Sequence, residues 1–251
     1  MTNVNELYLY LENAIPRELS CEWDNDGRMC VPCFNREVKK VLICLDINED
    51  AVDYAAENKF DCIISHHPLI FNPLKNVDAE NNVAKKVCKL IKNDIVAFSF
   101  HTRLDKVSGG VNDALADIMG LKNTEDFSDV GRMGKVEQVC LKDFAERLKK
   151  DLNSDRVICV DGGKKVSKIA VVGGSGKDYL EEALNCGCDT FVTGEVPYNR
   201  EQDAKEMGIN LVCLGHYFTE NVVCERLEML VKNYDSMIYT ERFETNPAFT
   251  V

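Results

Sequence analysis

The stretch KVLICLDINEDAVDYAAENKFDCIISHH, from Lys40 to His67, gives the clearest indication of the fold class. Two short apolar runs, Val41–Leu45 and Cys62–Ser65, enclose the segment Glu49–Glu57, in which small and apolar residues recur at helical spacing. A short strand, a helix and a second short strand are the pattern of a βαβ unit in a parallel sheet. The stretch therefore predicts an α/β fold.

The same alternation continues along the chain. In the first half we expect a further strand at Ile95–Phe100 and helices near Ala79–Ile91 and Gly110–Met119. In the second half we expect strands near Val136–Cys140, Arg156–Val160, Ile169–Val172, Thr190–Thr193 and Asn210–Leu214, and helices near Leu141–Leu152, Asp178–Leu184, Arg200–Glu206 and Thr219–Tyr234. The polar stretch Asn123–Asp129 is expected to join two similar α/β domains with mainly parallel sheets, residues 1–125 and 126–251.

A second stretch, KIAVVGGSGKDYLEEALNCGCDTFVTGE from Lys168 to Glu195, aligns with the first without a gap. Strand falls on strand, and four aligned pairs are identical: Lys40/Lys168, Asp50/Asp178, Ala55/Ala183 and Asp61/Asp189. The shared strand–helix–strand register indicates an internal duplication. In this alignment Gly194 and Glu195 take the places of His66 and His67, and two similar domains would face a shared cleft with their strand ends.

Composition excludes several functional classes. Thirty basic against forty-two acidic residues leave a formal charge of −12, which disfavours nucleic-acid or acidic-membrane partners. The start of the chain, MTNVNELYLYLENAIP, lacks a basic leader region, and no stretch approaches about 18 uninterrupted apolar residues, so we expect neither export nor a membrane span. Several of the twelve cysteines, such as Cys44, Cys62 and Cys213, lie in apolar runs, which fits free thiols in a reducing cytoplasm.

All four histidines follow predicted strands. His66 and His67 follow one strand, His101 the next, and His216 a late strand of the second half. Open α/β sheets bind ligands at the carboxyl ends of their strands. Pro68 favours an extended conformation at His67, so the two adjacent imidazoles can point toward different metal ions. The histidines therefore predict a functional site.

Two carboxylates sharpen this prediction. Asp105 lies four residues after His101, and Glu220 lies four residues after His216, so each pair can share one face of a helical turn about 6 Å apart. Imidazole nitrogens and carboxylate oxygens suit zinc, manganese, iron or nickel, and a bridging carboxylate lets two cations lie about 3.5–4 Å apart. The spacing predicts a two-metal site. The pair Cys30–Cys33 lacks a second CxxC and is interpreted as a loop feature.

Several longer motifs occur in a characteristic order between Leu11 and Glu220. They are WDNDG (Trp23–Gly27), SHHPLIF (Ser65–Phe71), HTRLD (His101–Asp105), GGVNDALA (Gly109–Ala116), TGEV (Thr193–Val196) and GHYFTE (Gly215–Glu220). With these motifs the chain resembles the GTP cyclohydrolase I type 2 homologue family.

That resemblance implies a two-domain protomer, a toroidal homohexamer and a dinuclear metal centre in the cleft between the domains. The implied ligands are His66, His67, Asp105, His216 and Glu220. Asp105 and Glu220 are both candidates for the bridging carboxylate, and the catalytic groups would be Glu220 and, beside the metals, His101. Asn199 stands where the family usually has a histidine, so we assign that position no acid–base role.

A metal pair suggests metal-assisted hydrolysis. By resemblance the substrate is GTP, whose purine imidazole ring would be attacked by water on the way to dihydroneopterin triphosphate. A metal-handling or regulatory ring protein without turnover is the alternative from another class, and a hydrolase of another phosphate or cyclic ester would use the same centre. The glycines of Gly173–Gly176 and the side chain of Arg103 are candidate phosphate contacts, with a plain turn and a structural role as their alternatives.

Overall fold

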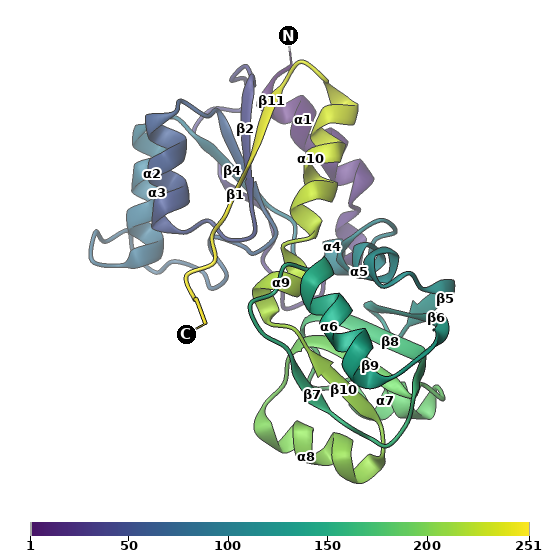
Figure 1. Ribbon diagram of the computed structural model, residues 1–251. Helices are drawn as coiled ribbons and strands as arrows, with labels where there is room; N and C mark the ends of the chain where they lie inside the picture. The colour runs from purple at the N-terminus through teal and green to yellow at the C-terminus, as the bar shows by residue number, and fades with distance from the viewer. Residues whose placement is uncertain (1, 251) are drawn as a thin grey trace. The chain divides into compact units, whose positions relative to one another are not determined.

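The computed structural model describes residues 2–250, which form two compact α/β units (Figure 1). The first unit contains the residues up to Val107 together with Val223–Asn246, and the second contains Ser108–Val222 and the residues from Pro247 onward. The chain thus leaves the first unit after Val107 and returns to it at Val223. This division differs from the expected boundary at residue 125 in two ways: the second unit begins already at Ser108, and the last helix and strand join the first unit.

The first unit is built on a sheet with the strand order β1-β4-β3-β2-β11. The strands are β1 (Gly27–Cys30), β2 (Lys40–Cys44), β3 (Cys62–Ser65), β4 (Val96–Ser99) and β11 (Tyr239–Phe243). All neighbours are parallel except β1, which runs antiparallel to β4. The helices are α1 (Val4–Ala14), α2 (Glu49–Glu57), α3 (Asn82–Lys92), the short α4 (Thr102–Lys106) and α10 (Val223–Tyr234), and a 3₁₀ turn covers Arg17–Leu19.

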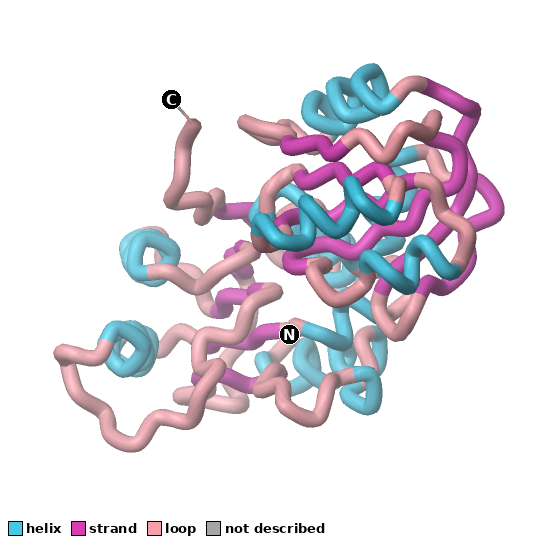
Figure 2. Tube along the Cα trace, turned by 90° about the horizontal axis from the view of Figure 1, so that it is seen from below, coloured by secondary structure: helices cyan, strands magenta, loops and turns pink. Residues whose placement is uncertain are grey.

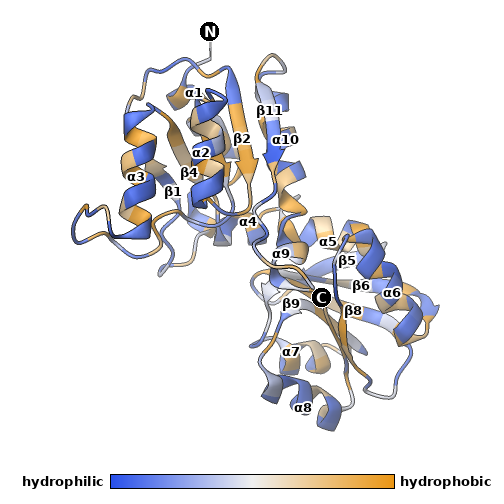
Figure 3. Cartoon of the chain, turned by 60° about the vertical axis from the view of Figure 1, so that its left-hand side comes forward, coloured by the Kyte–Doolittle hydropathy of each residue, from blue (hydrophilic) through white to orange (hydrophobic). Residues whose placement is uncertain are grey.

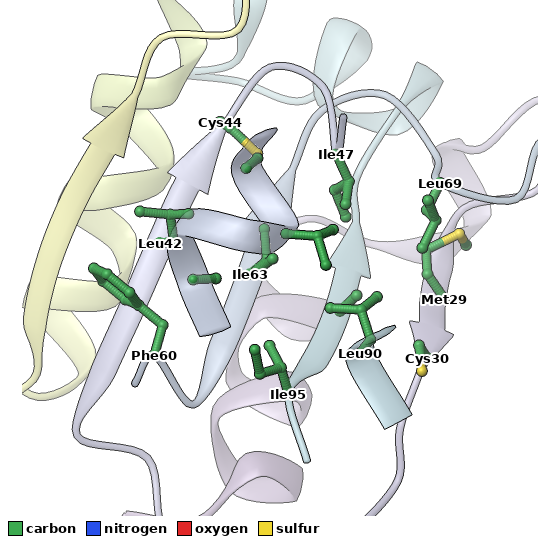
Figure 4. Close-up of a cluster of buried hydrophobic side chains, with 14 residues drawn as sticks. Met29, Cys30, Leu42, Cys44, Ile47, Phe60, Ile63, Leu69, Leu90 and Ile95 are labelled. Carbon is green, nitrogen blue, oxygen red and sulfur yellow. The ribbon is translucent and has the colours of Figure 1, made fainter. Parts of the chain in front are cut away.

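Helices cover both faces of this sheet, with α2 and α3 on one face and α1 and α10 on the other (Figure 1). Side chains alternate along β2, so Leu42 faces the core under α2 and α3. Figure 4 shows this core, where Leu42 and Ile63 from the sheet lie with Leu90 from α3. Figure 3 shows the largely hydrophobic β2 against α2 and α3, which carry hydrophobic and hydrophilic residues. The buried apolar face of each helix holds it on the sheet.

Helix α2 illustrates how local sequence sets an element. The Asn48 side chain caps its first turn by accepting a hydrogen bond from the Ala51 amide at 2.8 Å. Ala51, Val52 and Ala55 recur at helical spacing and are buried. The helix ends at Glu57, two residues before Lys59 adopts a positive φ of 56°. Its bounds are those predicted from the sequence.

The second unit is built on a sheet with the order β5-β6-β8-β9-β10-β7. The strands are β5 (Lys122–Phe127), β6 (Gly131–Val139), β7 (Ile158–Val160), β8 (Val166–Ser175), β9 (Thr190–Glu195) and β10 (Asn210–Cys213). Only the β8–β9 and β9–β10 pairs are parallel among the strands described, so the expectation of a mainly parallel sheet holds for the first unit and is wrong for the second.

Helices also flank the second sheet (Figure 2). They are α5 (Val111–Met119), α6 (Leu141–Asp151) and α9 (His216–Glu220), with α7 (Leu180–Asn185) and α8 (Tyr198–Met207) on the opposite face. Phe191 on β9 and Leu180 on α7 belong to the core under α7 and α8. No helix between residues 2 and 250 combines the length and the apolar character needed to cross a membrane.

The shared register of the two halves is confirmed by matching hydrogen bonds. The Asp61 carboxylate accepts from the Lys40 amide at 2.9 Å, and the Asp189 carboxylate accepts from the Lys168 amide at 2.8 Å. In both copies the lysine Nζ donates to the carbonyl oxygen three residues before the aspartate, at 2.6 Å. The identical residues therefore hold the same strand-to-strand crossing in each unit.

Two expectations for the second half are wrong. The polar stretch Asn123–Asp129 is not a linker, because β5 covers most of it and pairs antiparallel with β6. This strand lies at the edge of the sheet, where all its side chains except that of Phe127 are exposed, so a polar sequence suits it. The predicted helix Thr219–Tyr234 is divided into α9 and α10 between Glu220 and Val223, where the chain passes from one unit to the other.

Candidate metal centre

The strand ends of the first unit bring three imidazoles together. His66 and His67 follow β3, and His101 follows the neighbouring parallel strand β4, so their side chains lie at the same edge of the sheet. The ring centroids are 5.0 Å apart for His66 and His67, 5.4 Å for His66 and His101, and 5.6 Å for His67 and His101. Donor nitrogens of the three rings lie within 4.8 Å of one another, close enough to hold a metal ion.

Each of these imidazoles is oriented through its Nδ1 atom. Nδ1 of His66 lies 2.9 Å from the carbonyl oxygen of Phe100. Nδ1 of His67 lies 2.8 Å from Oδ1 of Asp46, and Nδ1 of His101 lies 2.8 Å from Oδ1 of Asp24. An oxygen acceptor at Nδ1 places the proton there, which leaves the lone pair of Nε2 to bind a metal.

Asp105 adds a carboxylate to this cluster. It lies on α4, which begins immediately after His101. Its Oδ1 atom is 3.6 Å from Nε2 of His66, while the side chain is partly exposed. A nitrogen and an oxygen donor thus face each other in a partly buried setting, a donor set that suits a divalent transition metal.

The second unit presents a smaller cluster at the corresponding edge of its sheet. His216 and Glu220 lie on α9, one turn apart, with Nε2 of His216 at 2.9 Å from Oε2 of Glu220. Nδ1 of His216 lies 3.0 Å from Oε1 of Glu195, at the end of β9. This imidazole therefore has an oxygen at Nδ1, as the other three have, and a carboxylate oxygen near Nε2.

Gly174 allows Glu220 to approach the sheet. A Cβ atom at this position would lie 2.0 Å from Oε1 of Glu220 and 3.2 Å from Nε2 of His216, and the backbone has a φ of +62° that favours glycine. The Gly174 amide donates to Oγ1 of Thr219 at 3.1 Å. Gly173–Gly176 therefore belongs to a strand and turn that pack against α9, and the phosphate-binding interpretation is not supported.

Asp24 holds a charge beside His101. Its side chain is buried and accepts hydrogen bonds from His101, from the Thr102 amide at 3.0 Å and from the Thr102 hydroxyl at 2.7 Å. Burial raises the pKa of this carboxyl, but the hydrogen bonds from His101 and Thr102 outweigh burial and lower the pKa to about 2. Asp24 is therefore a carboxylate at neutral pH, and it accepts the hydrogen bond that orients the His101 ring.

Sequence reasoning missed the three carboxylates that orient imidazoles. Asp46 lies two residues after the end of β2, at the carboxyl end of a strand, where ligands were expected. Glu195 occupies the position of His67 in the duplicated register. Asp24 lies in the WDNDG motif, but its pairing with His101 joins residues 77 positions apart. The strand-end rule applied to acidic residues would have found the first two.

Arg103 has a structural role instead of a phosphate contact. Its guanidinium is fully buried and donates to Asp26 at 2.9 Å, to Glu12 at 2.6 Å and to the carbonyl oxygen of Ile15 at 2.9 Å. Two carboxylates thus balance its charge inside the first unit. These bonds join α4 to α1 and to the loop before β1.

Comparison with known proteins gives the family. The model of the family described as Duf34/NIF3 (NGG1p interacting factor 3) matches residues 2–247. The chain belongs to the DUF34/NIF3 family. The resemblance read from the motifs is confirmed, because curated relatives of this DUF34/NIF3 protein carry the name GTP cyclohydrolase 1 type 2 homolog.

Two such relatives come from clostridia. The protein from Clostridium acetobutylicum is 34% identical, with 86% of this chain and 85% of the relative covered. The protein from Clostridium perfringens is 30% identical, with 99% of this chain and 95% of the relative covered. The similarity therefore extends over both units of the DUF34/NIF3 chain.

Solved structures support the same assignment. A Bacillus cereus protein related to NIF3 has a TM-score of 0.93 and 25% identity, with 100% of this chain and 99% of that one covered. Reduced HcgD from Methanocaldococcus jannaschii has a TM-score of 0.85 and 27% identity, with 96% of this chain and 97% of that one covered. The α/β fold of this DUF34/NIF3 protein is thus shared with both solved structures.

Proposed function

We propose that this protein is a hydrolase that depends on two divalent transition-metal ions, with zinc, iron, manganese and nickel as candidates. The observation that carries the proposal is the uniform orientation of the histidines. All four imidazoles have an oxygen acceptor at Nδ1, and two of them have a carboxylate oxygen near Nε2. Imidazoles that serve only packing have no need of this shared arrangement.

The proposed ligands are those implied by the family resemblance. His66, His67 and Asp105 form one set, and His216 and Glu220 form the other. We propose that the two sets complete a single dinuclear centre with Asp105 or Glu220 as the bridging carboxylate. The donor atoms fit the metals, since nitrogen and carboxylate oxygen are the ligands that these ions take in proteins.

Bound divalent cations would supply the Lewis acidity that hydrolysis needs. His101 is proposed to hold and move a proton at its Nε2 atom, because Asp24 binds Nδ1 at 2.8 Å and fixes the orientation of the ring. The Asp24 carboxylate stabilises the imidazolium that forms when His101 accepts a proton. The Glu220 carboxylate, held against Gly174, is proposed to keep its ligand position during turnover.

The proposed substrate is GTP, with hydrolysis of the purine imidazole ring toward dihydroneopterin triphosphate. Support comes from the name of the relatives and from the reaction class that two metals favour. The assembly is proposed to be a homohexameric toroid, as the resemblance implies. A cytoplasmic location is proposed because buried thiols such as Cys44 and Cys62 suit a reducing compartment.

The test is incubation of metal-loaded protein with GTP, followed by mass detection of the products. Ring-opened or pterin products that disappear in the chelated protein and in His101→Ala would support the proposal. A panel of cyclic nucleotides and phosphate esters in the same assay identifies hydrolysis of another substrate. Stable binding of two metals without any product would favour a metal-handling protein.

A further inference from the structure

Two exposed aromatic side chains stand beside the imidazole cluster of the first unit. Trp23 is 64% exposed and Phe71 is 46% exposed. Each ring centroid lies 6.2 Å from that of His101, and the two aromatic centroids lie 6.1 Å apart. Both rings meet His101 edge-on, at interplanar angles of 77° and 84°. Two large apolar rings are thus left in water around one imidazole.

The backbone that carries Trp23 is held on both sides. The Cys21 amide donates to Oγ1 of Thr102 at 3.0 Å, and Asp24 accepts from His101 and Thr102. The Asn25 side chain donates to the carbonyl oxygen of Ile70, which ties this loop to the residue before Phe71. Both rings therefore lie on anchored segments. Ligand binding would then cost little conformational entropy of the protein.

A cavity of about 470 Å³ adjoins this pair, and Phe71 forms part of its wall. Its polar lining includes Asn72, Lys75 and Asn76. A ligand with a flat ring at the aromatic pair would thus have amides and one cationic side chain available for its polar substituents.

We propose that the exposed face of Trp23 is a stacking platform for a planar heteroaromatic ring of the substrate, and that Phe71, whose ring is inclined at 59° to that of Trp23, contacts the edge of the same heteroaromatic ring. The inference rests on the proposed function in one respect, that the ring lies beside His101 because His101 transfers a proton there. Exposed aromatic side chains bind bases through their faces and tolerate different bases, which is the property required here. The substrate class is therefore a nucleobase or a related heteroaromatic compound.

Trp23 is the only tryptophan of the chain, so its fluorescence reports on the platform alone. We would titrate the full metal-loaded protein with guanosine, GTP and inorganic triphosphate. Guanosine and GTP should quench the emission to saturation, whereas inorganic triphosphate should leave it unchanged. Equal quenching by inorganic triphosphate, or no quenching by any of the three at millimolar concentration, would overturn the proposal.

Variants identify the contribution of each ring. Stacking of one base predicts that Trp23→Ala weakens guanosine binding by about 5-fold to 150-fold in calorimetry, while Trp23→Phe restores part of the affinity. Phe71→Ala should weaken binding and reduce the quenching of Trp23. The matched control is Phe34→Ala, because Phe34 is 47% exposed in the same unit but contacts Arg28. Equal affinity of Phe71→Ala and Phe34→Ala would refute the platform.

The same measurements separate this inference from the proposed function. Saturable quenching by guanosine without any hydrolysis of GTP would retain the platform and reject the hydrolase. If Trp23→Ala forms product with the same KM for GTP as wild type, the hydrolase is retained and the platform is rejected. Two results together would assign the rings to contact with a second copy of the chain and overturn the proposal. They are a change of oligomeric state in Trp23→Ala and a loss of guanosine quenching when the wild-type protein is diluted.

Discussion

Replacement of Gly174 by alanine tests whether the position of Glu220 serves metal binding. The new Cβ would lie 2.0 Å from Oε1 and 2.9 Å from Cδ of Glu220, where ordinary contacts are well above 3 Å. Because the clashing atoms belong to the end of a flexible side chain, the carboxylate can move away by about 1 Å or more at little cost in folding free energy. The displaced carboxylate would then no longer lie beside Nε2 of His216.

The second cost of Gly174→Ala is backbone strain at a φ of +62°, about 1–2 kcal/mol. Gly187→Ala is the matched control, because Gly187 has a φ of +75° in the same unit and no atom lies within 4 Å of its added Cβ. Both variants should therefore lose a similar 2–8 °C in the melting midpoint of the apoprotein. Only Gly174→Ala should also weaken metal binding, by about tenfold or more.

The assay combines melting curves of chelated protein with elemental analysis after dialysis against a fixed free metal concentration. Equal metal content in Gly174→Ala and Gly187→Ala, at equal loss of midpoint, would show that the Glu220 carboxylate is not a ligand where the structure holds it. A much larger decrease of the melting midpoint in Gly174→Ala than in Gly187→Ala would show that the Glu220 side chain cannot move away from the added Cβ. The argument from side-chain flexibility would then fail.

Four further predictions follow from the same residues. Protein purified without chelator should contain close to two equivalents of first-row transition metal per chain by elemental analysis, and a reproducible value of one or fewer after reconstitution contradicts a dinuclear centre. His67→Ala should lower the bound metal, whereas His101→Ala should retain most of it and lose hydrolysis; loss of both metals from folded His101→Ala would make His101 a ligand. Removal of metal should lower the melting midpoint by roughly 8–16 °C, since a ligand at a thousandfold excess over Kd contributes about 4 kcal/mol and each kcal/mol is worth about 2–4 °C; superimposable curves with and without metal speak against this. The folded-state pKa of Asp24, about 2, lies below its usual 3.8, so the Asp24 carboxylate contributes at most about 2 kcal/mol to the free energy of unfolding above pH 4, and this contribution is lost as the pH falls toward 2. The free energies of urea unfolding of wild type and Asp24→Asn should therefore converge on acidification. A difference between them that does not change with pH would contradict the assignment.

Local elements could be predicted from the sequence because their signals are local. The cap at Asn48 and the apolar spacing of Ala51, Val52 and Ala55 define α2 without reference to the rest of the chain. The apolar run Cys62–Ser65 is recovered as β3 with unchanged bounds. Elements without an apolar pattern were missed, such as the edge strand β5, whose side chains are polar and exposed except for that of Phe127.

Local sequence patterns were enough to predict the α/β alternation, the repeated strand–helix–strand register and the placement of four histidines after strands, because each depends on residues close together in the chain. The pairing of His101 with Asp24 and the burial of Arg103 between Glu12 and Asp26 emerge only on folding, because these contacts join residues 77 to 91 positions apart. The return of α10 and β11 to the first unit likewise depends on long-range packing. Hydrogen-bond partners and burial depend on which distant segments pack together, and the local pattern of side chains does not contain that information.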